Sequence, residues 1–236
     1  MIDGQKFYVK TKVTGIDEAK SLREGVYEQH VTSFFCSIIK KGMTVVDVGA
    51  SLGYYTLLAA KRVGNNGKVI AFEPEPYSFE ILKRNIQVNG WKNVQIFNIA
   101  ASDREEQLEI TSPLTGLAGS SLHKYLPFRN RTFNCKAVPL DAFFTRESPD
   151  VVKIDVEGAE VRVLRGMRKA LRDGVQIICE VHPDILSSLG FNVKDIEHIL
   201  NDFGYKIYII NTDGKLSPAS HILNECKHYL FVQERL

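Results

Sequence analysis

The sequence predicts an α/β fold with a doubly wound, mostly parallel sheet and helices on both faces. From residue 43 onward, short segments rich in β-branched residues alternate with longer amphipathic segments. Many of the short segments are apolar along their whole length, as strands buried on both faces are. The regular strand–helix order then gives parallel strands joined by crossover helices.

The first 41 residues are expected to form a strand and a helix ahead of a core spanning residues 42–236. The stretch "QKFYVKTKV" alternates like an edge strand or a hairpin arm. A helix is predicted over residues 28–40, because apolar residues recur at i, i+3, i+4, i+7 and i+8. The whole chain, 1–236, has the length of one large α/β domain.

Seven apolar segments predict the strands of the core. In chain order they are "MTVVDVG", "GKVIAFE", "NVQIFNIA", "DVVKIDV", "VQIICEV", "YKIYII" and "KHYLFV". Helices are predicted at residues 53–63 and 159–172. Two further helices are predicted from apolar residues at helical spacing. One contains Phe79, Leu82 and Ile86, and the other contains Ile196, Ile199, Leu200 and Phe203. Residues 104–149 are less regular and are expected to hold two short strands.

Composition narrows the class of protein. Hydrophobic residues make up 44% and charged residues 25%, as in soluble globular proteins. A net charge of +2 gives no argument for binding nucleic acid or an anionic membrane. No stretch resembles a signal peptide or a bilayer span, and the four cysteines are too widely spaced for a zinc ribbon. A reduced, cytoplasmic protein is expected.

A glycine loop follows the first core strand in "VVDVGASLGYYT". A dinucleotide-binding fingerprint would need glycine at Ser51 and a small residue at Tyr54. The alternative is the acid-x-G-x-G-x-G pattern of methyltransferases that use S-adenosylmethionine (SAM), with Ser51 replacing the middle glycine. Asp47 favours this second pattern, because a carboxylate can receive the ammonium of SAM but is unwelcome beside a pyrophosphate. The candidate contacts in this loop are Asp47, Gly49, Ala50, Ser51 and Gly53.

The next two strands also end in acids. Glu73, followed by Pro74, stands 20 residues beyond Gly53, where an acid can accept hydrogen bonds from both ribose hydroxyls of an adenosine. Asp103 follows the third strand and is placed to accept from the adenine amino group; a turn or helix-cap role is the alternative. Glu73, Pro74 and Asp103 are therefore predicted to bind cofactor.

Polar side chains also follow "DVVKIDV" and "VQIICEV", the strands expected beside the first one. The candidate catalytic residues are Asp155, Glu157, Glu180 and His182. An alcohol that attacks a methyl group needs a proton acceptor, and a histidine with an ordinary pKa of about 6.5 is a natural one. His182 is the predicted base, with Glu180 or Asp155 orienting it. Asp155 is also a candidate cofactor contact, and Glu157 is expected to touch substrate or cofactor.

Two other interpretations of these acids stay open. Glu157 and Glu160 could begin a helix, where acids complement the helix dipole, and Glu160 fits that role well. A divalent metal could instead be held by Asp155, Glu180 and His182, although no metal is favoured.

At these residues the sequence resembles the FkbM-type SAM-dependent methyltransferases. The resemblance covers roughly residues 24–232 and is most specific in "VVKIDVEGAE" with the following "EVHP". It implies a Rossmann-like class I methyltransferase fold with a seven-stranded sheet, SAM as cofactor, and methylation of an oxygen on a sugar or other small metabolite. The residues on matching motif positions are Asp47, Gly49, Glu73, Asp155, Glu157, Glu180 and His182.

Two further segments are expected near the site. Residues 111–133 form a long, irregular and basic stretch that is either a substrate lid or a surface loop. Tyr27 and Glu28 are expected to cover the cofactor from the N-terminal helix.

Three functions compete at this point. The expected partner is a small hydroxylated acceptor, which makes the chain an O-methyltransferase. A nucleic-acid methyltransferase lacks support, because the chain has neither an N/D-P-P-Y/F motif nor a strongly basic surface. A non-catalytic adenosine-binding module would not need the acids and histidine that end the fourth and fifth strands.

Overall fold

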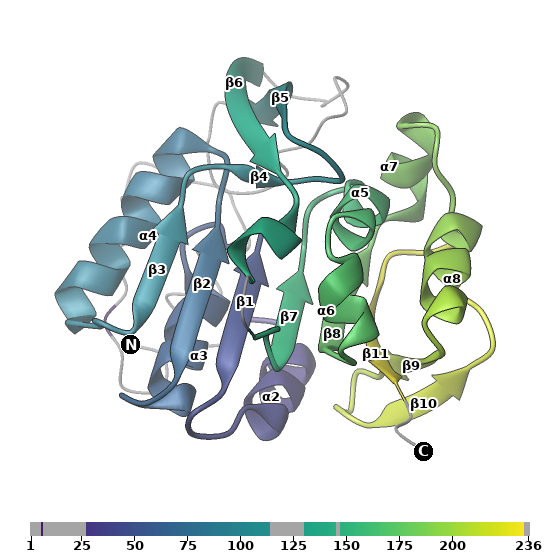
Figure 1. Cartoon of the computed structure of the whole chain (residues 1–236), viewed down its shortest axis with the longest axis horizontal. Helices are drawn as coiled ribbons and strands as arrows, with labels where there is room; N and C mark the ends of the chain where they lie inside the picture. Colours follow the sequence, from purple (N-terminus) through teal and green to yellow (C-terminus); the bar gives the residue numbers. More distant parts are fainter. Residues whose placement is uncertain (1–5, 7–26, 114–129, 145–146, 234–236) are drawn as a thin grey trace.

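The main sheet of the protein has eight strands in the order β10-β9-β11-β8-β7-β1-β2-β3 (Figure 1). The computed structural model describes residues 6, 27–113, 130–144 and 147–233. The strands are β1 (Thr44–Val48), β2 (Lys68–Phe72), β3 (Val94–Phe97), β7 (Val151–Ile154), β8 (Gln176–Val181), β9 (Tyr205–Ile210), β10 (Leu216–Ala219) and β11 (Lys227–Gln233).

The strand order reverses at β1, which confirms the predicted doubly wound sheet. β1 pairs in parallel with β2 on one side and with β7 on the other. The predicted count of seven strands was one too low, because β10 adds an antiparallel edge next to β9. This short strand contains Pro218 and has no alternating pattern, so nothing in its sequence predicts it; proline is tolerated at such an edge.

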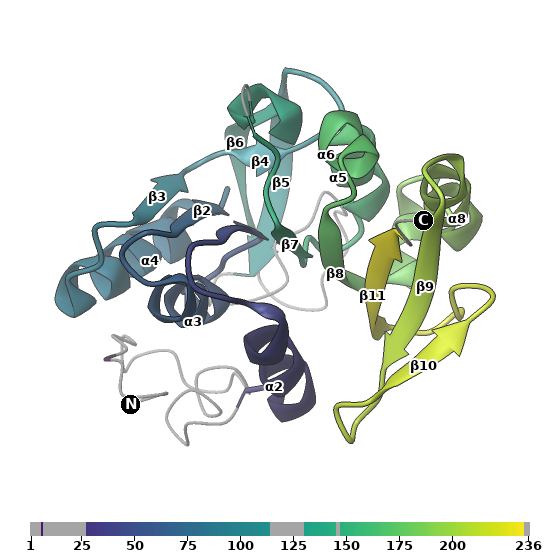
Figure 2. The same ribbon diagram turned by 60° about the horizontal axis from the view of Figure 1, so that its bottom comes forward.

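Helices cover both faces of the sheet (Figure 2). One face carries α2 (Gln29–Ile38), α3 (Tyr54–Val63) and α4 (Pro76–Asn89), and the other carries α5 (Glu160–Arg165), α6 (Arg168–Arg172), α7 (Pro183–Ser188) and α8 (Val193–Asp202). Side chains alternate between the faces along each strand. Val45 and Val151 therefore pack with α2 and α3, whereas Val46 and Val152 pack with α5 to α8.

The helix predicted over residues 159–172 is interrupted at Gly166, which ends α5. A Cβ atom at Gly166 would lie 1.9 Å from the carbonyl oxygen of Ser102. Only glycine therefore fits at this position, where two backbones approach closely. The sequence around Gly166 does not reveal that contact.

The irregular region forms a second, three-stranded sheet beyond the carboxyl ends of β1 and β2 (Figure 1). Its strands are β4 (Ala100–Ala101), β5 (Glu106–Pro113) and β6 (Asn130–Val138), followed by the 3-10 helix η1 (Leu140–Phe143). The two expected strands are confirmed as β5 and β6. Most of the predicted lid, residues 114–129, and the N-terminal strand lie outside the described residues.

Two expectations drawn from composition can be compared with the structure. In the part of the chain that the structure describes, no helix is both long enough and apolar enough to cross a bilayer. All four cysteines are free thiols, and Cys226 is the exposed one.

Gly49 offers a test of the glycine loop, because its backbone has φ +82° and packs against β7. A Cβ atom there would lie 1.8 Å from the carbonyl oxygen of Asp155. Gly49→Ala should lower the free energy of unfolding, measured in urea, by much more than the backbone strain of a positive φ alone would. Gly42 is the matched control, since it has φ +87° with open space around it, and Gly42→Ala should cost about 1–2 kcal/mol. Equal losses in the two variants would contradict the close contact.

Candidate active site

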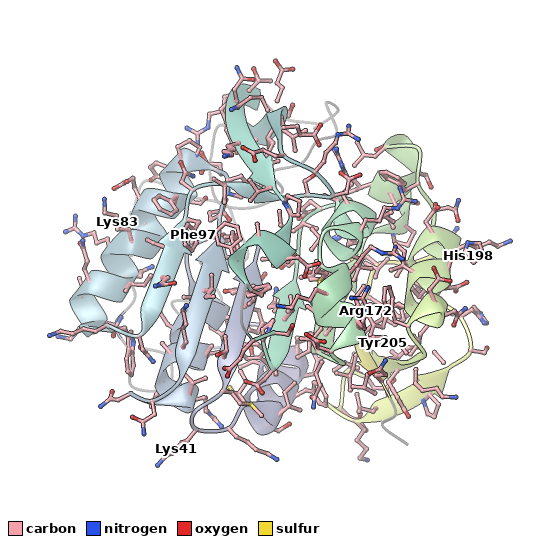
Figure 3. The ribbon with its side chains drawn as sticks, in the orientation of Figure 1. Lys41, Lys83, Phe97, Arg172, His198 and Tyr205 are labelled. Carbon is pink, nitrogen blue, oxygen red and sulfur yellow. The ribbon has the colours of Figure 1, made fainter. Side chains whose placement is uncertain are left out.

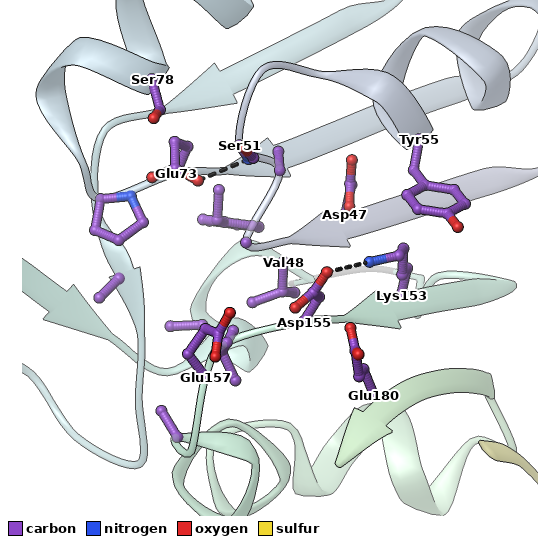
Figure 4. A pocket seen from close by; sticks show the side chains of 18 of the residues that line it. Asp47, Val48, Ser51, Tyr55, Glu73, Ser78, Lys153, Asp155, Glu157 and Glu180 are labelled. Carbon is purple, nitrogen blue, oxygen red and sulfur yellow. Dashed lines mark hydrogen bonds and ion pairs between the residues drawn. The ribbon is translucent and has the colours of Figure 1, made fainter. Parts of the chain in front are cut away.

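A cavity of about 240 Å³ opens at the carboxyl ends of β1, β2, β7 and β8 (Figure 4). The glycine loop that follows β1 forms one wall. Gly49 and Ala50 donate backbone hydrogen bonds to the carbonyl of Phe72, which ties the loop to β2. Gly53 has φ +94° and starts α3. The loop residues Gly49, Ala50 and Ser51 line the cavity, and Gly53 does not.

Asp47 presents an unsatisfied carboxylate oxygen in this cavity. The side chain is 1% exposed, and its Oδ2 accepts a hydrogen bond of 2.6 Å from the Thr56 hydroxyl. Its Oδ1 is buried without a hydrogen-bond partner. Burial raises the pKa of Asp47 above its ordinary value. A buried acceptor of this kind is stabilised by a ligand that brings a cation, such as an amino-acid ammonium.

Glu73 lies at the opposite end of the cavity, held by backbone donors on both carboxylate oxygens. Its Oε2 accepts from Ser51 N at 2.7 Å (Figure 4), and its Oε1 accepts from Glu75 N at 2.8 Å. Burial raises its pKa to about 8 against the effect of these two donors. Each oxygen keeps a second lone pair, so the group can accept from two ribose hydroxyls. Pro74 lines the cavity beside it.

Asp103 lies next to the cavity and binds two residues of its wall. Its Oδ1 accepts from Arg162 Nε at 3.2 Å and from the Ser102 hydroxyl at 3.1 Å. Arg162 and Ser102 line the cavity, whereas Asp103 does not. The carboxylate therefore contacts Arg162 from outside the cavity lining, and its contact with adenine stays a prediction.

Lys153 is a fully buried cation on the cavity floor, a role that the sequence interpretation missed. Its Nζ lies 3.0 Å from Asp155 Oδ2 and 4.4 Å from the ring centroid of Tyr55. Asp47 is its cross-strand neighbour in the β1–β7 register. Burial alone would lower the pKa of Lys153, but Asp155 and Asp47 outweigh it and hold that pKa above its ordinary value. The feature of the sequence that pointed to this role was a lysine within an apolar strand.

Carboxylates surround His182, which begins α7 directly after β8. Its Nδ1 lies 3.1 Å from Glu160 Oε1, and its Nε2 lies 3.6 Å from Glu157 Oε2 and 3.7 Å from Glu180 Oε1. Burial disfavours the imidazolium, but Cys226 and these acids raise the pKa of His182 to about 12. A pKa raised in this way favours the imidazolium form at neutral pH.

His182 is thus a close partner of the neighbouring acids, and its role as the base stays a prediction. Of the two predicted orienting residues, Glu180 lies near the ring, 3.7 Å from Nε2. Glu160, which the sequence placed in the first turn of a helix, does begin α5, and it also makes the shortest contact to His182. Asp155 instead pairs with Lys153.

Glu157 is the acid whose protonation is best matched to neutral pH. It lines the cavity, and its side chain is 27% exposed. Burial raises its pKa to about 7, against the opposing effect of His182. A carboxylate with that pKa can accept a proton and release it again near pH 7.

Backbone strain gathers at this cavity. Among the described residues, three that are not glycine have positive φ: Glu28 at 41°, Ser51 at 48° and Glu157 at 50°. All three line the cavity. Such conformations cost about 1–2 kcal/mol each and persist where the surroundings require them. Glu28 and Tyr27 lie at the cavity wall, as expected.

The residues of the cavity fit SAM. The unpartnered oxygen of Asp47 suits its ammonium, Glu73 suits its ribose, and Gly49 leaves no room for a side chain beside the loop. The family model described as the methyltransferase FkbM domain matches residues 47–207 of the chain. The chain belongs to the FkbM methyltransferase family. It is a SAM-dependent methyltransferase with a class I fold.

Individual relatives agree with this assignment. The hexuronic acid methyltransferase AglP of Haloferax volcanii is 26% identical over 194 residues, which cover 80% of this chain and 74% of that protein. The crystal structure of methyltransferase FkbM from Methylobacillus flagellatus aligns with a TM-score of 0.53 and 18% identity, over 81% of this chain and 43% of that one. A putative methyltransferase of Streptococcus mutans in complex with SAH has a TM-score of 0.50 and 10% identity, over 86% and 94% of the two chains.

The assignment of Glu73 to the ribose is tested by Glu73→Ala. Above about pH 8, where Glu73 is ionised, loss of a charge-assisted pair of hydrogen bonds costs about 1.5–3 kcal/mol, so SAM should then bind roughly 10- to 150-fold more weakly in calorimetry. Glu105→Ala is the control, because that exposed acid pairs with Lys136 away from the cavity lining. Thermal unfolding of both variants checks that the loop beside Ser51 remains folded. Unchanged SAM affinity in Glu73→Ala would refute the assignment.

Proposed function

We propose that this FkbM-family enzyme methylates a hydroxyl group of a sugar or another small metabolite. The observation that carries the proposal is Glu157, a strained and partly buried acid whose pKa of about 7 suits a general base. Methylation of an alcohol releases one proton per turnover, and an acid tuned in this way can receive it.

Asp47, Glu73 and the glycine loop would hold SAM, which would supply a methyl group on a sulfonium with the carbon–sulfur bond breaking as that group is transferred. The proton of the acceptor hydroxyl goes to Glu157, and from there to solvent. Asp155 stays beside Lys153 and places negative charge in the cavity, which favours a positively charged cofactor.

His182 serves this chemistry as a fixed cation. It lies against Glu157, Glu160 and Glu180, and without a cation these acids would repel one another. Its charge also lowers the pKa of Glu157, which burial would otherwise push higher. We therefore place His182 among the positioning residues.

A sugar acceptor is supported by the relative AglP, whose name gives hexuronic acid as its substrate. The proposal includes a single catalytic domain, because helices pack on both faces of one continuous sheet. It also includes a cytoplasmic location, which the four free thiols support.

The base assignment is tested by the pH dependence of methyl transfer. The carboxylate form of Glu157 accepts the proton, so the rate at saturating SAM should rise with pH, with its inflection near pH 7, and level off at higher pH. Glu157→Gln should lower the rate by about 10²–10⁴ and remove this rise. SAM affinity measured by calorimetry should change little. A normal rate in Glu157→Gln would show that positioning alone suffices.

His182→Gln distinguishes the two candidate bases. Loss of the cation should raise the pKa of Glu157, so the rise in rate should move to higher pH. If His182 were the base, the rise would disappear and the rate would fall at every pH. The readout is the position of the inflection, which a general loss of stability would not move.

A further inference from the structure

A second group of ligands lies on the cavity wall beside the residues that carry the chemistry. It consists of Glu28 at the start of α2, Glu180 on β8 and His228 on β11. One donor atom from each lies within 4.8 Å of the other two. Glu180 and His228 are direct cross-strand neighbours, so the sheet register brings them together. The proposed methyl transfer assigns no task to His228.

The distances within this group are long for hydrogen bonds. His228 Nε2 lies 3.4 Å from Glu180 Oε2 and 3.5 Å from Glu28 Oε2. Hydrogen bonds between nitrogen and oxygen are usually 2.7–3.2 Å long, and this buried Nε2 has no hydrogen-bond partner. Two ligand atoms that each lie about 2.1 Å from one metal ion are about 3.0–3.4 Å apart, which is close to the observed spacing.

We propose that Glu28, Glu180 and His228 bind a divalent transition-metal ion. Two carboxylates and one neutral imidazole carry a charge of −2, which a dication neutralises. If His228 were protonated instead, the three groups would together carry a charge of −1. Mixed oxygen and imidazole ligands suit Mn²⁺, Fe²⁺ or Zn²⁺ better than the purely oxygen-liganded Ca²⁺.

Groups around the ligands hold them in place, as outer-shell groups do at metal sites. The Tyr55 hydroxyl donates to Glu28 Oε2 at 2.6 Å, and the Cys226 thiol donates to Glu180 Oε1 at 3.3 Å. Glu28 and Glu180 line the cavity, so an ion there keeps coordination positions open toward it. A hydroxyl of the acceptor would occupy one of them; this last step rests on the proposed function.

The neighbouring group of Asp155, Glu157 and His182 is a weaker candidate. His182 Nδ1 already contacts Glu160 at 3.1 Å, and Asp155 already pairs with Lys153 at 3.0 Å. The metal set considered from the sequence, with Asp155, Glu180 and His182, is therefore not the one that we propose.

The test uses the full chain, stripped with chelator and titrated with Mn²⁺ in the absence of SAM. Electron paramagnetic resonance measures free Mn²⁺ and should show one site filled below millimolar concentration. Glu28→Gln and His228→Gln should each weaken binding by roughly 100-fold, since even outer-shell changes cost 10- to 100-fold. Tyr55→Phe should weaken it by about tenfold. His198→Gln is the control, because this exposed residue lies on α8 at the outer edge of the protein (Figure 3).

Pulsed measurements on the bound ion identify the histidine directly. Coupling to one imidazole nitrogen should be present in the wild type and in His182→Gln, and absent in His228→Gln. Coupling that is lost in His182→Gln but kept in His228→Gln would show that the ion binds the group of Asp155, Glu157 and His182 instead, which would overturn the proposal. No stoichiometric Mn²⁺ at submillimolar concentration would overturn the proposal and leave His228 as an imidazolium between two carboxylates. Because no methyl transfer is measured, failure of this test is distinct from failure of the proposed function.

Discussion

The rest of the site depends on the contacts of one buried cation, the ammonium group of Lys153. It lies on the cavity floor with Asp155 at 3.0 Å, Asp47 as its cross-strand neighbour and the ring of Tyr55 beside it. Removing one partner from such a buried pair costs about 3–5 kcal/mol, because the other charge is left uncompensated. The glycine loop packs on the backbone of Asp155, so the cofactor loop and the end of β7 share this support.

Beyond Lys153, acids and cations alternate along the cavity wall. Glu28 and Glu180 flank His228, and Glu180 also lies near His182, which in turn contacts Glu157 and Glu160. Lys153 and His182 compensate part of the negative charge of these acids. The acids still outnumber the cations, which suits a site that receives a sulfonium. It also explains why strained backbone is tolerated at Glu28 and Glu157, since both side chains are fixed by charge.

The sequence predicted the central strands well because each is buried on both faces and shows a continuous apolar run. It also predicted that Asp47, Glu73, Asp155 and Glu157 would meet, since the carboxyl ends of parallel strands share one edge of the sheet. β10 and the break at Gly166 were not predictable, because both depend on contacts between distant segments. The pairing of Glu180 with His228 likewise depends on the register of β11, which no local pattern reveals.

The role that we propose for His182 departs from the sequence prediction for a physical reason of the same kind. A histidine's ordinary pKa makes it the usual choice for a base, but its actual pKa follows from the charges that the fold brings to it. Glu157 comes from the turn after β7, Glu160 from the start of α5 and Glu180 from β8, so three separate contacts raise the pKa of the ring. Burial then acts in opposite directions on the two partners: it disfavours the imidazolium and favours the protonated carboxyl. The ion pairs override burial at His182, whereas burial prevails at Glu157, which leaves the carboxyl group as the one that titrates near neutral pH.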